Sequence, residues 1–269
     1  MILSTYHAHT DFCDGSATAE EMVLAAIERG CAEIGFSGHS PIPGEDYWCM
    51  SESGAVEYRD ALSALREKYK GKIRIYIGVE QDVISTTMTE SYDFVIGSVH
   101  GLVREGKMLP VDIKPEIVKQ NVDTYYGGDP YAYVEDYYLT VSEAYLRTGC
   151  DIIGHFDLVT KFIEREPFFS VSHPRYIAAR DAALERLLMS PALFEVNTGA
   201  IARGYRTAPY PEMAVIERIA AAGKPLVINS DAHTRDTVDF LLAETAMELD
   251  RLKIPYVTTL DEVLSLTRG

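Results

Sequence analysis

The sequence has 269 residues, enough for one large domain with a full hydrophobic core. Apolar residues make up 47% of the chain and charged residues 25%, values typical of a globular protein rather than a disordered or fibrous one. Lys and Arg number 25 against 41 Asp and Glu, so the formal net charge is −16. This acidic excess argues against a broad nucleic-acid footprint and against a basic membrane patch. A small anionic ligand would need a local cationic site.

The sequence carries no signal for export or membrane insertion. Residues 1–7 lack both a positively charged start and a long apolar stretch. No apolar run approaches the roughly 18 residues of a membrane-spanning helix. The four cysteines are far apart and form no C-x-x-C pair, which argues against a zinc knuckle or a disulfide scaffold. We therefore expect a cytoplasmic, reduced enzyme domain.

Short β-branched segments alternate with longer amphipathic segments along the whole chain. The first helix is predicted from Thr18, where a capping box with Glu21 opens an apolar-periodic run that Gly30 ends. The predicted strands cover residues 2–6, 33–37, 73–79, 93–98, 151–154, 193–196, 225–229 and 254–257. The predicted helices cover residues 18–27, 53–69, 130–147, 175–189, 211–222, 238–252 and 260–267.

This alternation predicts an α/β fold with a parallel sheet. Seven or eight strand–helix units in one chain fit an irregular (β/α) barrel better than an open sheet. The strand predicted at 93–98 follows its predecessor too soon for a standard unit. Because no linker, repeat or low-complexity tract interrupts the pattern, we expect residues 1–269 to form a single domain.

Six of the seven histidines follow the ends of predicted strands, and three carboxylates share that position. In a parallel barrel all carboxyl ends of the strands point to one face, where active sites are built. These nine residues are therefore expected to converge on one cleft. They are His7, His9, Asp14, His39, Glu80, His100, His155, Asp231 and His233.

Each of these residues also has a structural interpretation. A lone histidine at a strand end is usually a hydrogen-bonded structural residue, and Asp14 or Asp231 alone would pass for a helix N-cap. Because these residues all lie at the carboxyl ends of their predicted strands, a common role is favoured instead. The His7-x-His9 pair also directs both imidazoles to the same side of an extended segment. Imidazoles and carboxylates together are ligands for zinc, manganese or iron, and nine exceed the needs of one ion. We therefore predict a multinuclear metal site, with His173 left as structural.

Other catalytic chemistries lack a sequence signal. The chain has no G-x-S-x-G, G-x-x-x-x-G-K-[ST] or G-x-G-x-x-G motif, which argues against serine hydrolase, P-loop and dinucleotide chemistry. No cysteine is followed by arginine six residues later, and no D-x-D motif occurs. Cysteine phosphatase and aspartyl-phosphate mechanisms are therefore not indicated. Attack by metal-activated water remains as the predicted mechanism.

The motifs around these residues resemble those of the polymerase-and-histidinol-phosphatase (PHP) metallohydrolases. They read His7-Ala-His-Thr10 with Asp14-Gly15, Gly38-His39-Ser40, Gly78-Val-Glu80, Gly97-Ser-Val-His100, Gly154-His-Phe-Asp157 and Asn229-Ser-Asp-Ala-His233. The resemblance implies a distorted (β/α)7 barrel, TIM-like, with up to three divalent metal ions (Zn, Mn or Fe). It assigns one ion to His7, His9, Glu80 and Asp231, a second to Glu80, His100 and His155, and a third to Asp14, His39 and His233.

Three further segments resemble the histidinol-phosphatase branch of that family, namely residues 154–161, 194–198 and 203–211. In that branch, basic residues after two of the strands bind the substrate phosphate. The matching positions here are Lys161, Arg203 and Arg206, which would otherwise be ordinary surface charges. Lysine offers a point charge where arginine offers a bidentate fork. The choice between the two arginines stays open.

The resemblance implies hydrolysis of L-histidinol phosphate to L-histidinol and phosphate, a step of histidine biosynthesis. The nucleophile would be a hydroxide that bridges two metal ions. Asp231 or His233 would manage the proton of the leaving alkoxide. The alternatives are a family phosphoesterase acting on nucleotides or phosphotyrosine, and a non-catalytic metal-binding regulatory module. The expected partner is a small phosphate ester, with no nucleic acid and no membrane. The oligomeric state stays open.

Overall fold

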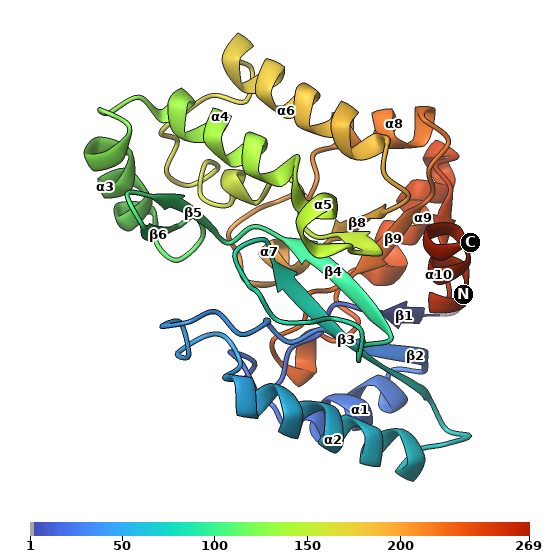
Figure 1. Cartoon of the computed structure of the whole chain (residues 1–269). Coiled ribbons are helices and arrows are strands. Elements are labelled where there is room, and N and C mark those ends of the chain that lie inside the picture. The colour runs from blue at the N-terminus through green and yellow to red at the C-terminus, as the bar shows by residue number, and fades with distance from the viewer. Residues whose placement is uncertain (1–2) are drawn as a thin grey trace.

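The computed structural model describes residues 3–269, and its central element is an eight-stranded parallel sheet (Figure 1). The strand order is β1-β2-β3-β4-β7-β8-β9-β10, so sequence order and spatial order agree. The strands are β1 (Leu3–Thr5), β2 (Cys31–Phe36), β3 (Arg74–Asp82), β4 (Phe94–Ser98), β7 (Ile152–Ile153), β8 (Leu193–Asn197), β9 (Leu226–Asn229) and β10 (Tyr256–Val257).

The sheet closes on itself at the carboxyl ends of its strands. Just beyond β1 and β9, Ala8 and Ala232 form a parallel bridge. His9 N–H donates to Ala232 O at 2.8 Å, and Ala232 N–H donates to His7 O at 3.1 Å. Seven strands thus form the ring, and β10 pairs with β9 outside it. This irregular closure confirms the predicted distorted (β/α)7 barrel.

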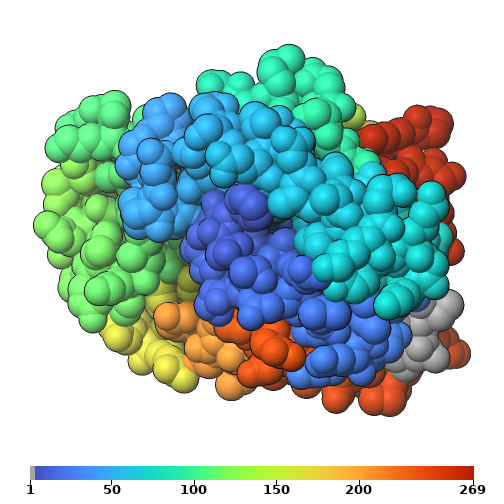
Figure 2. Space-filling view, turned by 90° about the horizontal axis from the view of Figure 1, so that it is seen from below, coloured from blue at the N-terminus to red at the C-terminus, as the bar shows by residue number. Residues whose placement is uncertain are grey.

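Helices connect the strands and cover the outside of the barrel (Figure 1). Thr18 and Thr259 cap the first and last helices with capping boxes, as the sequence pattern predicts for Thr18. The helices are α1 (Ala19–Glu28), α2 (Glu52–Lys68), α3 (Pro115–Tyr125), α4 (Pro130–Val141), α5 (Ala144–Thr148), α6 (Pro174–Leu188), α7 (Gly199–Ala202), α8 (Met213–Ala221), α9 (Leu242–Leu252) and α10 (Leu260–Arg268). Seen from below, the N-terminal segments of the chain form most of the surface (Figure 2).

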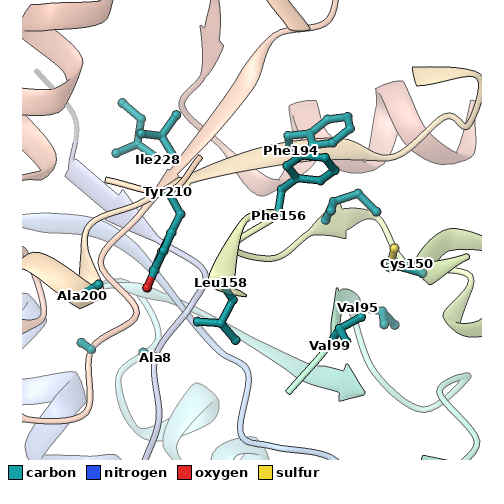
Figure 3. Close-up of a cluster of buried hydrophobic side chains, with 14 of the residues drawn as sticks. Ala8, Val95, Val99, Cys150, Phe156, Leu158, Phe194, Ala200, Tyr210 and Ile228 are labelled. Atoms are coloured by element: carbon teal, nitrogen blue, oxygen red, sulfur yellow. The ribbon is translucent and has the colours of Figure 1, made fainter. Parts of the chain in front are cut away.

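The strands divide their side chains between two hydrophobic clusters. In β7, Ile153 packs outward against the helices whereas Ile152 points into the barrel, as the two-residue period of a strand requires. Figure 3 shows part of the outer cluster, where Phe156 and Phe194 lie side by side with ring centroids 6.0 Å apart. The inner cluster consists of Tyr6, Phe94, Ile96, Ile152, Leu193, Val227, Leu260 and Val263.

Helix α10 supplies two members of the inner cluster and so closes the amino-terminal mouth of the barrel. Its first turn is held by Glu33, which accepts hydrogen bonds from the Tyr6 hydroxyl at 2.6 Å and from Leu260 N–H at 3.1 Å. Its last turn is held by Arg268, whose guanidinium donates to both carboxylate oxygens of Asp151 at 2.7 and 2.6 Å. With this mouth filled by apolar side chains, only the opposite end offers space for a polar site.

Several predicted elements differ from the observed ones. The antiparallel hairpin β5 (Gly101–Arg104) and β6 (Lys107–Pro110), and α3 after it, were not predicted. The hairpin escapes a search for parallel strand–helix units because its strands are four residues long and joined by a two-residue turn, Glu105-Gly106, with positive φ. The helix predicted at 130–147 is two helices. The helices predicted at 211–222 and 238–252 start later, at Met213 and Leu242. Residue 2 of the first predicted strand lies outside the described residues.

The structure also bears on membrane-spanning helices and on the cysteines. Among residues 3–269, no helix is both long and apolar enough to cross a bilayer. The thiols of Cys13, Cys31, Cys49 and Cys150 are unpaired, as their spacing in the sequence suggested.

The inner cluster yields a stability prediction. Leu260 is fully buried in the barrel mouth, so Leu260→Ala removes apolar contacts and leaves a cavity. We expect the free energy of unfolding to fall by about 2–5 kcal/mol in denaturant titration. Leu266→Ala on the same helix is the control: Leu266 is 52% exposed, so its loss should change stability by no more than about 0.5 kcal/mol. Equal effects of the two changes would contradict the role of α10 as a plug.

Candidate metal centre

The structure brings all nine predicted metal-ligating residues together at the carboxyl end of the barrel. His7 and His9 are completely buried beneath a cavity of about 250 Å³. The other seven line its wall, namely Asp14, His39, Glu80, His100, His155, Asp231 and His233. The expectation of one shared cleft is therefore met in the geometry.

Local backbone geometry sets the direction of three of these residues, His7, His9 and Asp231. Ala8 is held on both sides, by its bridge to Ala232 and by Ser37 N–H, which donates to Ala8 O at 3.0 Å. The extended segment therefore turns His7 and His9 to the same side. Asp231 adopts a left-handed backbone conformation, with φ of 49°. A Cβ atom at Gly199 would lie 2.7 Å from the Asp231 carboxylate, so only glycine allows this approach.

Glu80 lies at the centre of the cluster, and five imidazoles surround its carboxylate. Oε1 is 2.8 Å from His155 Nε2 and 3.3 Å from His100 Nε2. Oε2 is 2.9 Å from His39 Nδ1, 3.2 Å from His7 Nε2 and 3.5 Å from His9 Nε2. One carboxylate thus faces five histidines from four segments of the chain, an arrangement suited to bridging two metal ions.

The donor atoms fall into four groups whose members lie within 4.8 Å of one another. The groups overlap the ion assignments that the family resemblance implies but do not reproduce them. His7, His9, His39 and Glu80 each belong to two groups, and His100 and His155 fall in separate groups. The four groups are His9-Asp14-His39-His233, His7-Glu80-His155, His7-His9-Asp231 and His39-Glu80-His100.

Four buried atoms in this cluster have no hydrogen-bond partner among the described residues, namely His155 Nδ1 and the three atoms His7 Nε2, His9 Nε2 and Glu80 Oε2. An unsatisfied buried polar atom is costly, and natural proteins pair nearly all of them. The three atoms lie close together and can all present lone pairs to the same space. A bound cation would satisfy all three at once. The residues present therefore fit a divalent metal site.

The electrostatics favour the protonation states that metal binding needs at Glu80 and His9, but not at His7. Burial opposes ionisation of Glu80, but the charges of His7 and His100 outweigh it and hold the pKa of Glu80 well below its usual range. Burial lowers the pKa of His9 to about 3, helped by His233 and His39, so this imidazole is neutral at pH 7. Burial also opposes protonation of His7, but Glu195 and Glu80 raise its pKa well above the usual range. A metal ion must displace that proton.

Two buried carboxylates behind the ligands were not predicted as site residues. Glu195 accepts hydrogen bonds from His7 Nδ1 at 2.9 Å and from His155 N–H at 2.7 Å. Asp82 lies 3.1 Å from His100 Nδ1 and also accepts from His100 N–H at 2.8 Å. An ionised carboxylate can only accept a hydrogen bond, so each of these acids requires a proton on the Nδ1 atom of its histidine. The Nε2 atoms of His7 and His100 are thereby left facing the candidate metal site. Glu195 had a signal in the sequence, since an acid within an apolar strand rarely occurs unless it is paired. Asp82 follows the polar residues Glu80 and Gln81 and had no such signal.

The three predicted phosphate-binding residues lie in different settings. Arg203 and Lys161 line the cavity, whereas Arg206 does not. Arg203 donates to Asp231 Oδ2 at 2.9 Å and to Asp231 O at 3.1 Å, and lies 2.9 Å from His233 Nδ1. Its guanidinium thus borders the metal centre.

Arg206 points away from the cavity. Its guanidinium lies 4.6 Å from the centroid of the Tyr210 ring and 3.9 Å from the Asp157 carboxylate. It also donates to the Thr160 hydroxyl, and its side chain is only 8% exposed. Burial raises the pKa of Asp157 to about 6 even beside this arginine. Arg206 is therefore placed to neutralise Asp157 rather than to meet a ligand.

The four hydrogen bonds to Glu195 lead to a prediction about metal affinity. Besides His7 and His155, the side-chain amides of Asn197 and Asn229 donate to it, at 2.8 and 2.9 Å. Glu195→Gln keeps the shape but turns an NH₂ group toward donors, so His7 loses its anchor. We expect metal affinity to fall by about 10- to 100-fold in competition with a chromogenic chelator.

The control for this change is Glu185→Gln, since Glu185 is 73% exposed on α6. It removes the same charge far from the cluster and should leave metal affinity unchanged. Wild-type affinity in the Glu195→Gln protein would contradict the anchoring role.

The comparisons with known proteins agree with this geometry. A probable histidinol-phosphatase of Deinococcus radiodurans is 29% identical over 257 residues, which cover 90% of this chain and 91% of that protein. The histidinol-phosphatase of Bacillus subtilis is 25% identical, with 87% of this chain and 94% of that protein covered.

A solved structure shares the fold. It is the histidinol phosphate phosphatase of Lactococcus lactis complexed with zinc, L-histidinol and phosphate, and it superposes with a TM-score of 0.68 at 22% identity over 94% of each chain. The family model described as the PHP domain matches residues 5–198, which carry seven of the nine clustered residues. The chain therefore belongs to the PHP domain family.

Proposed function

We propose that this protein is a metal-dependent phosphomonoesterase that hydrolyses L-histidinol phosphate to L-histidinol and phosphate in histidine biosynthesis. The observation that carries the proposal is the Glu80 carboxylate among five histidines, under a cavity of about 250 Å³ that also holds Arg203 and Lys161. A cavity of this size suits a small phosphate ester. The two curated relatives, which match nearly the whole chain, are histidinol-phosphatases by name.

The ligand groups support up to three divalent ions. His7, His9, Glu80 and Asp231 would hold one ion, Glu80, His100 and His155 a second, and Asp14, His39 and His233 a third. Zinc, manganese and iron all accept this ligand set. Such ions, when bound, lower the pKa of a coordinated water toward roughly 7 and offset the negative charge of phosphoryl oxygens.

The chain's own residues complete the site around the phosphate. Arg203 can offer its planar guanidinium to two phosphoryl oxygens, because it borders the cavity between Asp231 and His233. Lys161 adds a second positive charge at the cavity wall. We assign Arg206 to the support of this wall, through Asp157 and Thr160.

Asp231 and His233 are our candidates for the proton that the leaving alkoxide needs. Arg203 and His7 hold the pKa of Asp231 well below its usual range against the effect of burial. Asp231 therefore stays ionised and has no proton to donate to the alkoxide. His233 has a 20% exposed side chain at the cavity wall, which puts it nearer an incoming leaving group.

We further propose that residues 1–269 act as one catalytic unit. Asp231 and His233 lie beyond residue 198, where the family match ends, and α10 plugs the barrel. Four unpaired thiols suit a reducing compartment such as the cytoplasm. The net charge of −16 supports a small phosphate ester rather than nucleic acid as the partner.

The function is tested by phosphate release from a substrate panel. The panel holds L-histidinol phosphate, a nucleoside monophosphate and a phosphotyrosine peptide, with zinc, manganese or iron supplied in turn. We expect the highest kcat/KM for L-histidinol phosphate, and no turnover after His7→Ala with His9→Ala. Equal rates on all three substrates would overturn the named substrate. Undiminished activity of the double variant without bound metal would overturn the metal mechanism.

Arg203 borders the cavity and Arg206 does not, so we expect their substitution to affect catalysis and stability, respectively. Arg203→Met should lower kcat/KM by about 10²- to 10³-fold, the usual cost of removing one donor to a developing charge. Arg206→Met should leave Asp157 buried without its partner, and so lower the free energy of unfolding by about 3 kcal/mol. Steady-state kinetics and denaturant titration separate the two effects. Loss of catalysis in Arg206→Met at unchanged stability would reverse the assignment.

A further inference from the structure

Asp112 is a fourth carboxylate at the cavity wall and belongs to none of the ligand groups. The other acids that line the cavity, Asp14, Glu80 and Asp231, are all candidate ligands. Asp112 follows β6, where the hairpin returns to the barrel: the neighbouring Val111 N–H donates to His100 O at 2.9 Å. The hairpin β5–β6, which is not one of the strand–helix units of the barrel, therefore places a carboxylate at the cavity beside the metal centre.

Lys161 holds one side of this carboxylate. Its ammonium donates to Asp112 O at 2.8 Å and to Asp112 Oδ2 at 3.0 Å, and it lies 5.0 Å from the centroid of the Tyr205 ring. The second oxygen, Oδ1, accepts no hydrogen bond from any residue in 3–269. Burial opposes ionisation, but Lys161 and His100 outweigh it and lower the pKa of Asp112. One oxygen of this cavity-lining carboxylate thus has no hydrogen-bond partner among the described residues.

The rest of the cavity makes this anion unusual. Phosphate needs positive charge, and Arg203, Lys161 and the bound ions would supply it. A carboxylate in that field weakens phosphate binding, because like charges in a partly buried site repel strongly. Its presence is explained if part of the ligand is itself cationic.

We propose that Asp112 binds an ammonium group on the leaving alcohol and so selects phosphate esters of amino alcohols. The inference rests on the proposed function and names the feature of the substrate that the site recognises. In L-histidinol phosphate the ammonium is two carbons from the ester oxygen, so it must lie close to the phosphate. Asp112 lines the same cavity as Arg203 and Lys161, so a carboxylate is within the space that the phosphate and the ammonium would share. Trp48, Ile113 and Leu158 also line the cavity and offer apolar surface to the remainder.

The test compares substrates that differ only in the ammonium. One pair is L-histidinol phosphate with 3-(imidazol-4-yl)propyl phosphate, and the other is phosphoethanolamine with ethyl phosphate. For Asp112→Asn, we expect kcat/KM to fall about 10- to 100-fold on the ammonium substrates, as for loss of a hydrogen bond to a charged group. The rates on the two substrates without ammonium should change less than about threefold.

The matched control is Asp123→Asn, since the Asp123 side chain is 57% exposed on α3. It removes the same charge outside the cavity and should leave all four rates unchanged. Equal losses by Asp112→Asn within both pairs would show that Asp112 only positions Lys161, and would overturn the inference. No loss in either pair would overturn it as well.

The two pairs also separate this inference from the proposed function. If wild-type protein hydrolyses phosphoethanolamine faster than ethyl phosphate, and Asp112→Asn removes that preference, the inference holds even if L-histidinol phosphate is not preferred over the wider panel. If L-histidinol phosphate is preferred but Asp112→Asn leaves the ammonium preference intact, the proposed function stands and the inference fails.

Discussion

The structure depends on one constraint, the burial of the Glu80 carboxylate among five imidazoles. A buried anion is costly unless it is paired, and here the partners come from β1, β2, β4 and β7 or the segments just after them. A parallel barrel is the architecture that sends so many strand ends to one point. The irregular closure through Ala8 and Ala232 belongs to the same arrangement, because the residues on either side of this bridge are themselves clustered at the site.

The two ends of the barrel are opposites in chemistry. At the amino end α10 fills the mouth with apolar side chains, and Glu33 and Asp151 hold the helix in place. At the carboxyl end polar groups converge and leave a cavity. The net charge of −16 describes the chain as a whole but not this cavity, where arginine, lysine and bound ions would form a positive pole.

The nine clustered residues were predictable because each lies near or after the carboxyl end of a strand, and these ends share one face in a parallel barrel. Glu195 and Asp82 were not predicted, since the sequence does not say which imidazole nitrogen a buried acid will face. The hairpin β5–β6 was also missed, and with it the place of Asp112. Arg203 and Arg206 look alike in sequence, but the turn after α7 directs one to the cavity and the other to Asp157.

The α/β class, the strand–helix order and the nine residues that cluster at one end of the barrel could all be predicted from the sequence, because periodicity and the position of a residue along its strand are local properties. Only the tertiary structure decided the sharing of Glu80, the buried carboxylates behind the histidines, the plug formed by α10 and the charges that face a ligand. These depend on side-chain direction and on contacts between segments as far apart as His7 and Glu195, which no local pattern encodes.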